Sequence, residues 1–342
     1  MKIGLVGFPG TGKTTVFNAL TGLSAETGYG AARGKTNLGV VKVPDARVDA
    51  LSKLYKTKKT TYAEIAFSDV AAAPAGSQGQ GLDEKTLAAM REMDALCHVV
   101  RGFTKTTGEE PKPLQEAKNF EIEMNLSDLI LIERRLERLK KEKGKAVEQE
   151  LLERLKAALE GGKPLREVED LSPVDLTAIS GYRFLTLKPL LLVLNVSEAD
   201  AAKPAPEDLA THARESGLGL VVLAGAVEMD IAQMASEEQK EFVASLGLSE
   251  PAAGRFIRAA YALTDLISFL TAGEDECRAW PIRKGTTAQK AAGKITRISN
   301  EASFAPRSCA GTTWSTWGAK PNAAKPPSSV WKARTTLSPT ET

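Results

Sequence analysis

The chain is poor in the side chains that build metal centres and disulfide frameworks. Its 342 residues include three cysteines and two histidines. Cys97, Cys277 and Cys309 show neither metal-ligand spacing nor disulfide spacing. This composition is typical of a protein in a reducing compartment, so we expect a cytoplasmic location.

Excess charge and long apolar runs are absent as well. The net charge is +2 at pH 7, so contact with nucleic acid would need a local basic patch. No apolar stretch approaches the length of about 20 residues that a membrane-spanning helix needs. The first residues have the pattern of a strand and not of a secretory leader, and we expect no membrane partner.

What the sequence does contain is a glycine turn close to its N-terminus. Residues 7–14 read GFPGTGKT and fit G-x-x-x-x-G-K-[ST], between a strand pattern and a helix pattern. Glycines let backbone N–H groups converge on one anion, and the following helix directs its positive dipole end at it. Lys13 is placed to reach the β- and γ-phosphates, and the Thr14 hydroxyl to hold Mg²⁺. The expected phosphate-binding residues are Gly7, Pro9, Gly10, Thr11, Gly12, Lys13, Thr14 and Thr15.

The rest of the chain alternates strand and helix patterns on both sides of a charged insertion. Such alternation predicts an α/β fold with a parallel sheet and helices on its faces. We assign this domain to residues 1–117 and 178–264, and we separately predict one apolar helix over residues 256–270. The insertion at 118–177 has leucines at helical spacing. It predicts two antiparallel helices that turn near residues 143–146, as either a partner-binding arm or a solvated charged arm.

Two further strand ends carry polar residues that would complete a nucleotide site. Asp69 ends a strand before a glycine-rich loop, where a carboxylate can hold the Mg²⁺ shell. The alternative is that Asp69 only starts a turn and has no role toward Mg²⁺. Asn195 and Glu198 follow the first strand after the insertion, where base recognition is expected, although taken alone they could be helix caps.

Besides the glycine turn, the chain contains the segments FSDVAAAPAGSQGQGL, MREMDALCHVVRGF, FLTLKPLLLVLNVSE, AGAVEMDIAQM and FLTAGEDECRAWPIRKGTTAQKAAGKI. Through these segments, from residue 1 to about residue 295, the chain resembles the YchF or Obg-like ATPase family. It implies a P-loop NTPase domain, an inserted helical coiled coil and a C-terminal TGS module of β-grasp fold. It also implies slow ATP hydrolysis with Mg²⁺, association with the ribosome, and nucleotide contacts from Ala224 and Gly225.

The chain departs from the patterns of related proteins in the segment expected to recognise the base and in the glycine turn. Val196 and Glu198 stand where guanine-selective relatives have the Lys and Asp of N-K-x-D, so guanine selectivity is expected to weaken. A preference for adenine is what the resemblance implies. Gly10 stands where the family commonly has asparagine, which argues against stimulation by potassium.

The two switch segments also differ from the family pattern. The Mg²⁺-binding threonine of the first switch aligns near Arg33, and Thr36 is the nearest alternative. Ala72 replaces the glycine of D-x-x-G. Ala73 and Pro74 follow in place of a water-orienting glutamine, which matches the family's habit of an apolar residue at that position. We therefore expect slow turnover. The expected catalytic residues are Lys13 and Asp69, and the expected Mg²⁺ ligands are Thr14, Asp69 and Thr36.

From Thr296 the sequence leaves the family pattern abruptly. Codons chosen for TRISNEASFAPRSC reread one base over as TDIERGFIRAEVV, which fits the family, and the match persists through Ser338. We predict a one-base deletion after Ile295, with a diverged low-complexity tail as the alternative. The TGS module would then begin at residues 265–295 and stay incomplete, followed by an aberrant, disordered or aggregation-prone tail at 296–342.

Functions of different classes remain open at this point. The leading one is a monomeric ATPase that meets rRNA or a ribosomal protein through the coiled coil and the TGS module. The alternative is a nucleotide-gated binding module or GTPase switch in which hydrolysis is incidental. A small-molecule P-loop kinase is a third, but the sequence shows no pattern for an acceptor-binding lid.

Overall fold

The computed structural model describes residues 1–25, 37–70, 82–142, 146–245 and 250–299. The chain forms two compact units, one of residues 1–43 and 64–264 and the other of residues 44–63 with 265 onward. Residues 44–63, which the sequence assigns to the α/β domain, therefore pack with the C-terminal segment. The domain boundaries derived from the sequence stay predictions.

The larger unit is built on a six-stranded sheet in the order β2-β4-β1-β5-β6-β7. Its strands are β1 Lys2–Val6, β2 Asn37–Lys42, β4 Glu64–Asp69, β5 Ala95–Gly102, β6 Leu190–Val196 and β7 Gly219–Leu223. Neighbouring strands are parallel, except that β2 runs antiparallel to β4 at the edge. The buried strands β5 and β6 are continuous apolar runs, as expected where both faces of a sheet are covered. The mostly parallel sheet confirms the predicted α/β class.

Nine helices of the described ranges belong to this unit. They are α1 Lys13–Thr21, α3 Glu84–Arg91, α4 Pro113–Leu139, α5 Ala146–Glu160, α6 Pro173–Ile179, α7 Glu207–Glu215, α8 Gly225–Gln233, α9 Ser236–Ser245 and α10 Ala252–Leu263. Helices α4, α7 and α8 share one apolar core with the strands, to which they contribute Phe120, Leu209 and Val227. Among the described helices, none is long and apolar enough to cross a membrane.

Residues 256–270 do not form the single helix that the sequence predicts. Helix α10 ends at Leu263, and strand β8, Leu266–Ala272, begins three residues later. The Thr264 hydroxyl donates to the carbonyl of Tyr261 at 2.7 Å, and Asp265 adopts a positive φ of 52°. Aspartate tolerates this left-handed conformation better than most residues. The helix prediction was wrong because Thr264 and Asp265 end the helix within a largely apolar run.

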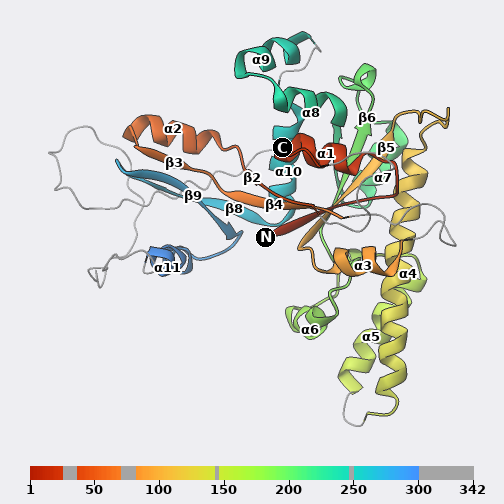
Figure 1. Cartoon of the computed structure of the whole chain (residues 1–342). Helices are drawn as coiled ribbons and strands as arrows, with labels where there is room; N and C mark the ends of the chain where they lie inside the picture. The colour runs from red at the N-terminus through yellow and green to blue at the C-terminus, as the bar shows by residue number, and fades with distance from the viewer. Residues whose placement is uncertain (26–36, 71–81, 143–145, 246–249, 300–342) are drawn as a thin grey trace. The chain divides into compact units, whose positions relative to one another are not determined.

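Helices α4 and α5 lie side by side, as Figure 1 shows in yellow and yellow-green. The first half of α4 packs on the sheet core through Phe120 and Met124. Its second half forms a separate apolar cluster with α5, to which these two helices contribute Ile132, Leu139, Leu151, Leu152, Leu155 and Leu159. Helix α4 is continuous from Pro113 to Leu139. The same helix therefore belongs to both the sheet core and the helical pair. The turn expected near residues 143–146 lies largely outside the described residues.

A buried polar cluster, here called the α3–α4 junction, joins the end of α3 to α4. The Arg91 guanidinium lies 2.8 Å from one Asp128 oxygen and 2.9 Å from the Ser127 hydroxyl. The other Asp128 oxygen accepts hydrogen bonds from the Thr186 backbone N–H and hydroxyl at 2.8 and 2.9 Å. The Asp128 side chain is completely buried, and these bonds offset the cost of removing its charge from water.

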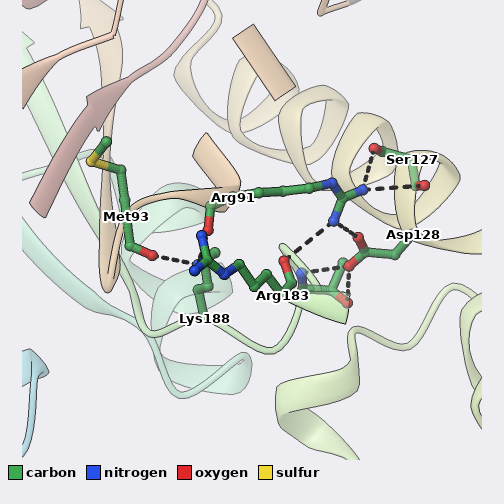
Figure 2. Close-up of polar contacts among 7 residues, drawn as sticks. Arg91, Met93, Ser127, Asp128, Arg183 and Lys188 are labelled. Atoms are coloured by element: carbon green, nitrogen blue, oxygen red, sulfur yellow. Dashed lines mark hydrogen bonds and ion pairs between the residues drawn. The ribbon is translucent and has the colours of Figure 1, made fainter. Parts of the chain in front are cut away.

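The same junction includes the segment that follows the helical pair. Lys188 donates to the carbonyls of Arg91 and Met93, and Arg91 donates to the carbonyl of Arg183 (Figure 2). Three segments that are far apart in sequence are therefore held together by side chains of both charges. The junction positions α4 against the sheet.

The smaller unit contains a three-stranded sheet in the order β3-β9-β8. Its elements besides β8 are α2 Ala46–Tyr55, β3 Lys59–Thr61, β9 Glu276–Arg283 and α11 Ala288–Ser299. Strands β8 and β9 are antiparallel, whereas β3 and β9 are parallel. The β-grasp assignment stays a prediction. Residues 296–299, expected in the disordered tail, are helical at the end of α11, and the rest of the tail lies outside the described residues.

Candidate functional site

The glycine turn joins the carboxyl end of β1, an interior strand of the sheet, to α1. Gly7 and Gly12 have φ values of 144° and 85°. Residues other than glycine rarely adopt such backbone angles. A Cβ on Gly12 would lie 2.2 Å from Asn195 Nδ2, and one on Gly7 would lie 2.5 Å from the Val99 carbonyl oxygen. The turn therefore has a shape that requires glycine at both positions, and α1 begins directly after it.

Lys13 opens α1, and its side chain folds back over the turn. Its ammonium donates a hydrogen bond of 3.0 Å to the carbonyl of Phe8. Burial lowers the pKa of Lys13 to about 8, while the charges of Asp69 and Glu116 act in the opposite direction. A buried cation that donates to a neutral carbonyl is costly in free energy. It would be stabilised by an anion at the turn.

Thr14 and Asp69, two of the Mg²⁺ ligands expected from the sequence, meet beside the turn. The Thr14 hydroxyl donates to Asp69 Oδ2 at 2.9 Å, and the Asn37 amide approaches the same oxygen at 3.4 Å. Asp69 is 5 % exposed. Hydroxyl and carboxylate oxygens are the ligands that Mg²⁺ prefers, so this donor pair fits the predicted metal. Thr36, the third predicted ligand, lies outside the described residues.

Asn195 connects the turn to the ends of two other strands. Its Nδ2 donates to the Thr11 carbonyl at 2.9 Å, and its Oδ1 accepts from the Gly225 backbone N–H at 2.9 Å. The side chain thereby holds the glycine turn against the ends of β6 and β7. Ala224 and Gly225, which the resemblance implied, lie at the start of α8 within this bridge. The geometry assigns Asn195 a positioning contact with the protein backbone.

Glu198 follows Asn195 by three residues. It begins the 3₁₀ turn Glu198–Asp200 just after β6, and it is exposed. In the turn itself, Pro9 and Gly10 are exposed and Thr15 is half-buried. Arg33, Ala72, Ala73 and Pro74 lie outside the described residues.

Three residues beside the turn carry no motif and were missed. Asn37 faces Asp69 because the two are paired in the register of β2 and β4. Glu116, in the first turn of α4, accepts the Arg101 backbone N–H at 3.3 Å, and burial raises its pKa to about 7. The half-buried ring of Phe103 lies 4.0 Å from where a Cβ on Gly12 would be. The only sequence signal for Phe103 is its place just after the end of a strand.

His98 lies behind the turn and has no role in it that the structure supports. Its ring is fully buried and stacks on Phe120 with centroids 3.9 Å apart. Burial, followed by the charge of Lys13, lowers the pKa of His98 to about 3. The imidazole is therefore neutral at physiological pH and belongs to the apolar core.

Two family models match the chain. One, described as "50S ribosome-binding GTPase", matches residues 2–135. The other, for the C-terminal region of YchF GTPases and described as "Protein of unknown function (DUF933)", matches residues 266–297. Together they cover the glycine turn and the start of the smaller unit's C-terminal segment.

Two bacterial proteins named "Ribosome-binding ATPase YchF" are similar over most of this chain. The one from Bacillus subtilis is 36 % identical over 311 residues, and the one from Haemophilus influenzae is 38 % identical over 306 residues. Each match spans 86 % of this chain and 84 % of the relative. The chain belongs to the YchF family.

A solved YchF structure agrees with this assignment. The structure titled "Structure of the Schizosaccharomyces pombe YchF GTPase" matches with a TM-score of 0.74 at 29 % identity, over 88 % of this chain and 85 % of that chain. The family resemblance and the P-loop GTPase-like α/β fold are thereby confirmed. The coiled coil and the TGS module stay predictions.

The C-terminal YchF match ends at residue 297. This is two residues beyond Ile295, where the sequence leaves the family pattern. The proposed one-base deletion itself stays a prediction.

Proposed function

We propose that this YchF-family chain binds ATP with Mg²⁺ at the glycine turn and hydrolyses it slowly in association with the ribosome. The observation that carries the nucleotide site is the meeting of Lys13, the Thr14–Asp69 pair and the Asn195 bridge at the carboxyl end of β1. The names of the bacterial relatives support ATP hydrolysis and ribosome binding. A ribosome partner would place the protein in the cytoplasm.

Each residue of the turn has a distinct role in this proposal. The buried ammonium of Lys13 would bind β- and γ-phosphate oxygens, and the N–H groups at the start of α1 would bind the same phosphates. The Thr14 hydroxyl would hold Mg²⁺, and Asp69 would orient the metal's water shell. When bound, Mg²⁺ would supply positive charge that neutralises the phosphates. Asn195 would keep the turn in its binding shape.

Slow turnover is inferred from the sequence of the second switch. Ala73 and Pro74 offer no side chain that could orient water, so the intrinsic rate is expected to be on the order of 10⁻³ s⁻¹, as in GTPases without an activating partner. Phosphate release from ATP by the purified chain, with and without ribosomes, tests this. A fast rate at micromolar enzyme without ribosomes would contradict the proposal.

The preferred base is proposed to be adenine. The relatives' names do not decide this, since the bacterial proteins are called ATPases and the yeast structure a GTPase. The physical argument is that Glu198 is one methylene longer than the aspartate that accepts two guanine donors. Loss of such a paired match weakens selection strongly.

Calorimetric titration with Mg²⁺ and non-hydrolysable ATP or GTP tests the base preference. We expect ATP to bind at least about tenfold more tightly, a difference of about 1.4 kcal/mol. The variant Glu198→Asp should narrow the difference, whereas Asp200→Glu in the same turn serves as the matched control. Tighter binding of GTP by the unmodified chain would overturn the adenine proposal and leave the phosphate site intact.

A nucleotide-gated binding module is a second candidate, favoured by Ala72. A Cβ at the glycine position of D-x-x-G would hinder the backbone movement toward the γ-phosphate, so hydrolysis would be incidental. A non-hydrolysable ATP analogue separates the two candidates. If it supports a full cycle of ribosome binding and release as well as ATP does, the gating role is correct.

The tail bears on the ribosome proposal. If one base is missing after Ile295, the TGS module is incomplete, and ribosome contacts through it would be impaired. Resequencing the locus decides this, because an intact frame through residues 296–342 would end the idea. A chain with the restored frame should bind ribosomes more tightly than the chain that ends in residues 296–342.

A further inference from the structure

Helix α4 carries an exposed apolar ridge that no described part of the chain covers. Ile122, Leu126 and Ile130 are 60 %, 50 % and 40 % exposed. They are spaced four residues apart, so they form one continuous i±4 ridge on the helix surface. Ridges of this kind are the units by which helices pack into the grooves of other helices. The ridge spans about 12 Å of the helix axis.

Basic residues continue the ridge at both ends. Lys118 lies four residues before Ile122, and Arg134 lies four residues after Ile130, and both are exposed. Neither forms an ion pair with a residue that the structure describes. The neighbouring Arg135, by contrast, is bound by Glu142 and Glu148. The two end charges of the ridge are therefore available to a partner.

Two acidic residues beside the ridge are bound by other parts of the described chain. Glu133 binds Lys156 at 2.9 Å, and Glu123 accepts the Leu82 backbone N–H at 3.4 Å. The exposed Glu137 lies beyond Arg134, toward the end of α4. The pattern along the ridge is thus basic, aliphatic and basic.

We propose that this ridge, from Lys118 to Arg134, is a docking surface for an amphipathic protein helix with aliphatic residues at its centre and an acidic residue at each end. The aliphatic centre would bury apolar surface, which phosphates and base edges of RNA cannot match. The two end charges would select the orientation of the partner and speed its association. The inference rests on the proposed ribosome association for the source of the helix, which is then a ribosomal protein.

A second copy of the chain does not fit this ridge. An antiparallel pair centred on Leu126 would place Lys118 of one copy beside Arg134 of the other. Charges of like sign in an interface are unfavourable. The ridge therefore selects against self-association and for a partner of opposite charge.

Photo-crosslinking with purified Bacillus subtilis ribosomes identifies what contacts the ridge. Leu126 is replaced by p-benzoylphenylalanine, and Val147, which is 81 % exposed on α5, is replaced likewise as the control. We expect Leu126 to label a helical ribosomal-protein segment with acidic flanks. Labelling of rRNA, of a second copy, or equally from Val147 would overturn the proposal.

Co-sedimentation measures the strength of the contact. Leu126→Glu, and the double change Lys118→Glu with Arg134→Glu, should each weaken ribosome binding at least about tenfold. Val147→Glu should leave it unchanged, and Leu126→Ser provides a milder second variant. Each variant should retain its helix signal and its Mg²⁺·ATP affinity, because the ridge is exposed and the residues are not part of the glycine turn.

The outcomes separate this proposal from the one on which it rests. If the unmodified chain does not bind ribosomes, the ribosome association itself is wrong. If the unmodified chain binds and Leu126→Glu binds equally well, the docking surface is wrong and the association stands.

Discussion

Two of the buried polar networks among the described residues of the larger unit differ in how fully their charges are satisfied. At the α3–α4 junction, the Asp128 carboxylate accepts hydrogen bonds at both oxygens, one set from Arg91 and the other from Thr186. At the glycine turn, the buried Lys13 ammonium donates to a neutral carbonyl. The junction and the glycine turn each bury a charged side chain. Among the described residues, an opposite charge lies in direct contact at the junction and not at Lys13.

This difference separates structural from functional polar residues. A satisfied pair such as Arg91–Asp128 stabilises one arrangement of helices, and removing one partner leaves the other uncompensated. A cation such as Lys13 reduces stability until an anion binds, so removing it should not destabilise the fold. Changes at the Arg91–Asp128 pair are therefore expected to lower stability and not binding. A change at Lys13 is expected to lower binding and not stability.

The largest effect is expected for Asp128→Ala. Removing the carboxylate leaves the Arg91 charge and the Thr186 donors unpaired, which should lower the free energy of unfolding by about 3–5 kcal/mol. Nucleotide affinity of the folded protein should be unchanged. Urea unfolding and calorimetric titration measure the two quantities, with the exposed Asp170→Ala as control. A loss below about 1 kcal/mol would show that the junction is not structural.

Lys13→Met should produce the reverse pattern. Loss of charge-assisted bonds to phosphate should weaken triphosphate binding about 100-fold, or about 3 kcal/mol. The free energy of unfolding should stay the same or rise, because a desolvated ammonium is removed. The exposed Lys85→Met is the matched control. An unchanged affinity for triphosphate in Lys13→Met would show that the Lys13 charge does not serve binding.

Asn195→Ala should lower both the free energy of unfolding and the affinity for triphosphate. The Thr11 carbonyl and the Gly225 N–H would lose their partner, at a cost of about 2–3 kcal/mol in unfolding free energy. The loosened turn should also bind triphosphate about tenfold more weakly. The same unfolding and titration experiments apply. A loss of stability without any loss of affinity would show that the bridge does not position the turn.

Glu116→Gln tests the smaller electrostatic effect beside the turn. Because the folded-state pKa of Glu116 is raised from 4.5 to about 7, the folded protein holds this proton more tightly between those values. Its contribution to stability therefore falls as pH rises from about 4.5 to 7, by about 3 kcal/mol. Comparing unfolding free energies of the two proteins across this range isolates the effect. A constant difference between them would contradict a buried Glu116.

Nucleotide affinity should also depend on pH through Lys13. Its folded pKa of about 8 lies below the ordinary 10.5, so the free protein loses this charge as pH rises above 8. We expect Mg²⁺·ATP binding to weaken above that pH in the unmodified chain. Lys13→Met should show no such dependence, and a dependence retained in that variant would point to another group.

Local sequence signals were sufficient for the centre of the larger unit. The glycine turn, the buried strands β5 and β6 and the strand-end Asp69 all follow from patterns within about ten residues. Asn195 was expected to follow an apolar strand, but it lies within β6, which continues to Val196. Its contacts with Thr11 and Gly225 depend on the order of strands in the sheet, which the sequence does not display.

Other features needed contacts between distant segments. Arg91 and Asp128 are 37 residues apart, and no motif marks either one. Asn37 meets Asp69 only through the antiparallel pairing of β2. The break between α10 and β8 depends on Thr264 and Asp265, whereas the surrounding apolar residues suit either a helix or a strand. The packing of residues 44–63 with the C-terminal segment was likewise set by a strand pairing, β3 with β9.

Hydrogen exchange with and without Mg²⁺ and ATP tests the central claim most directly, namely that the glycine turn binds a triphosphate. The account predicts slower exchange at residues 7–15 and 195–198 on addition of nucleotide, and no change at residues 183–188 of the junction. Exchange at residues 7–15 that is unaffected by either ATP or GTP, in folded protein, would contradict it.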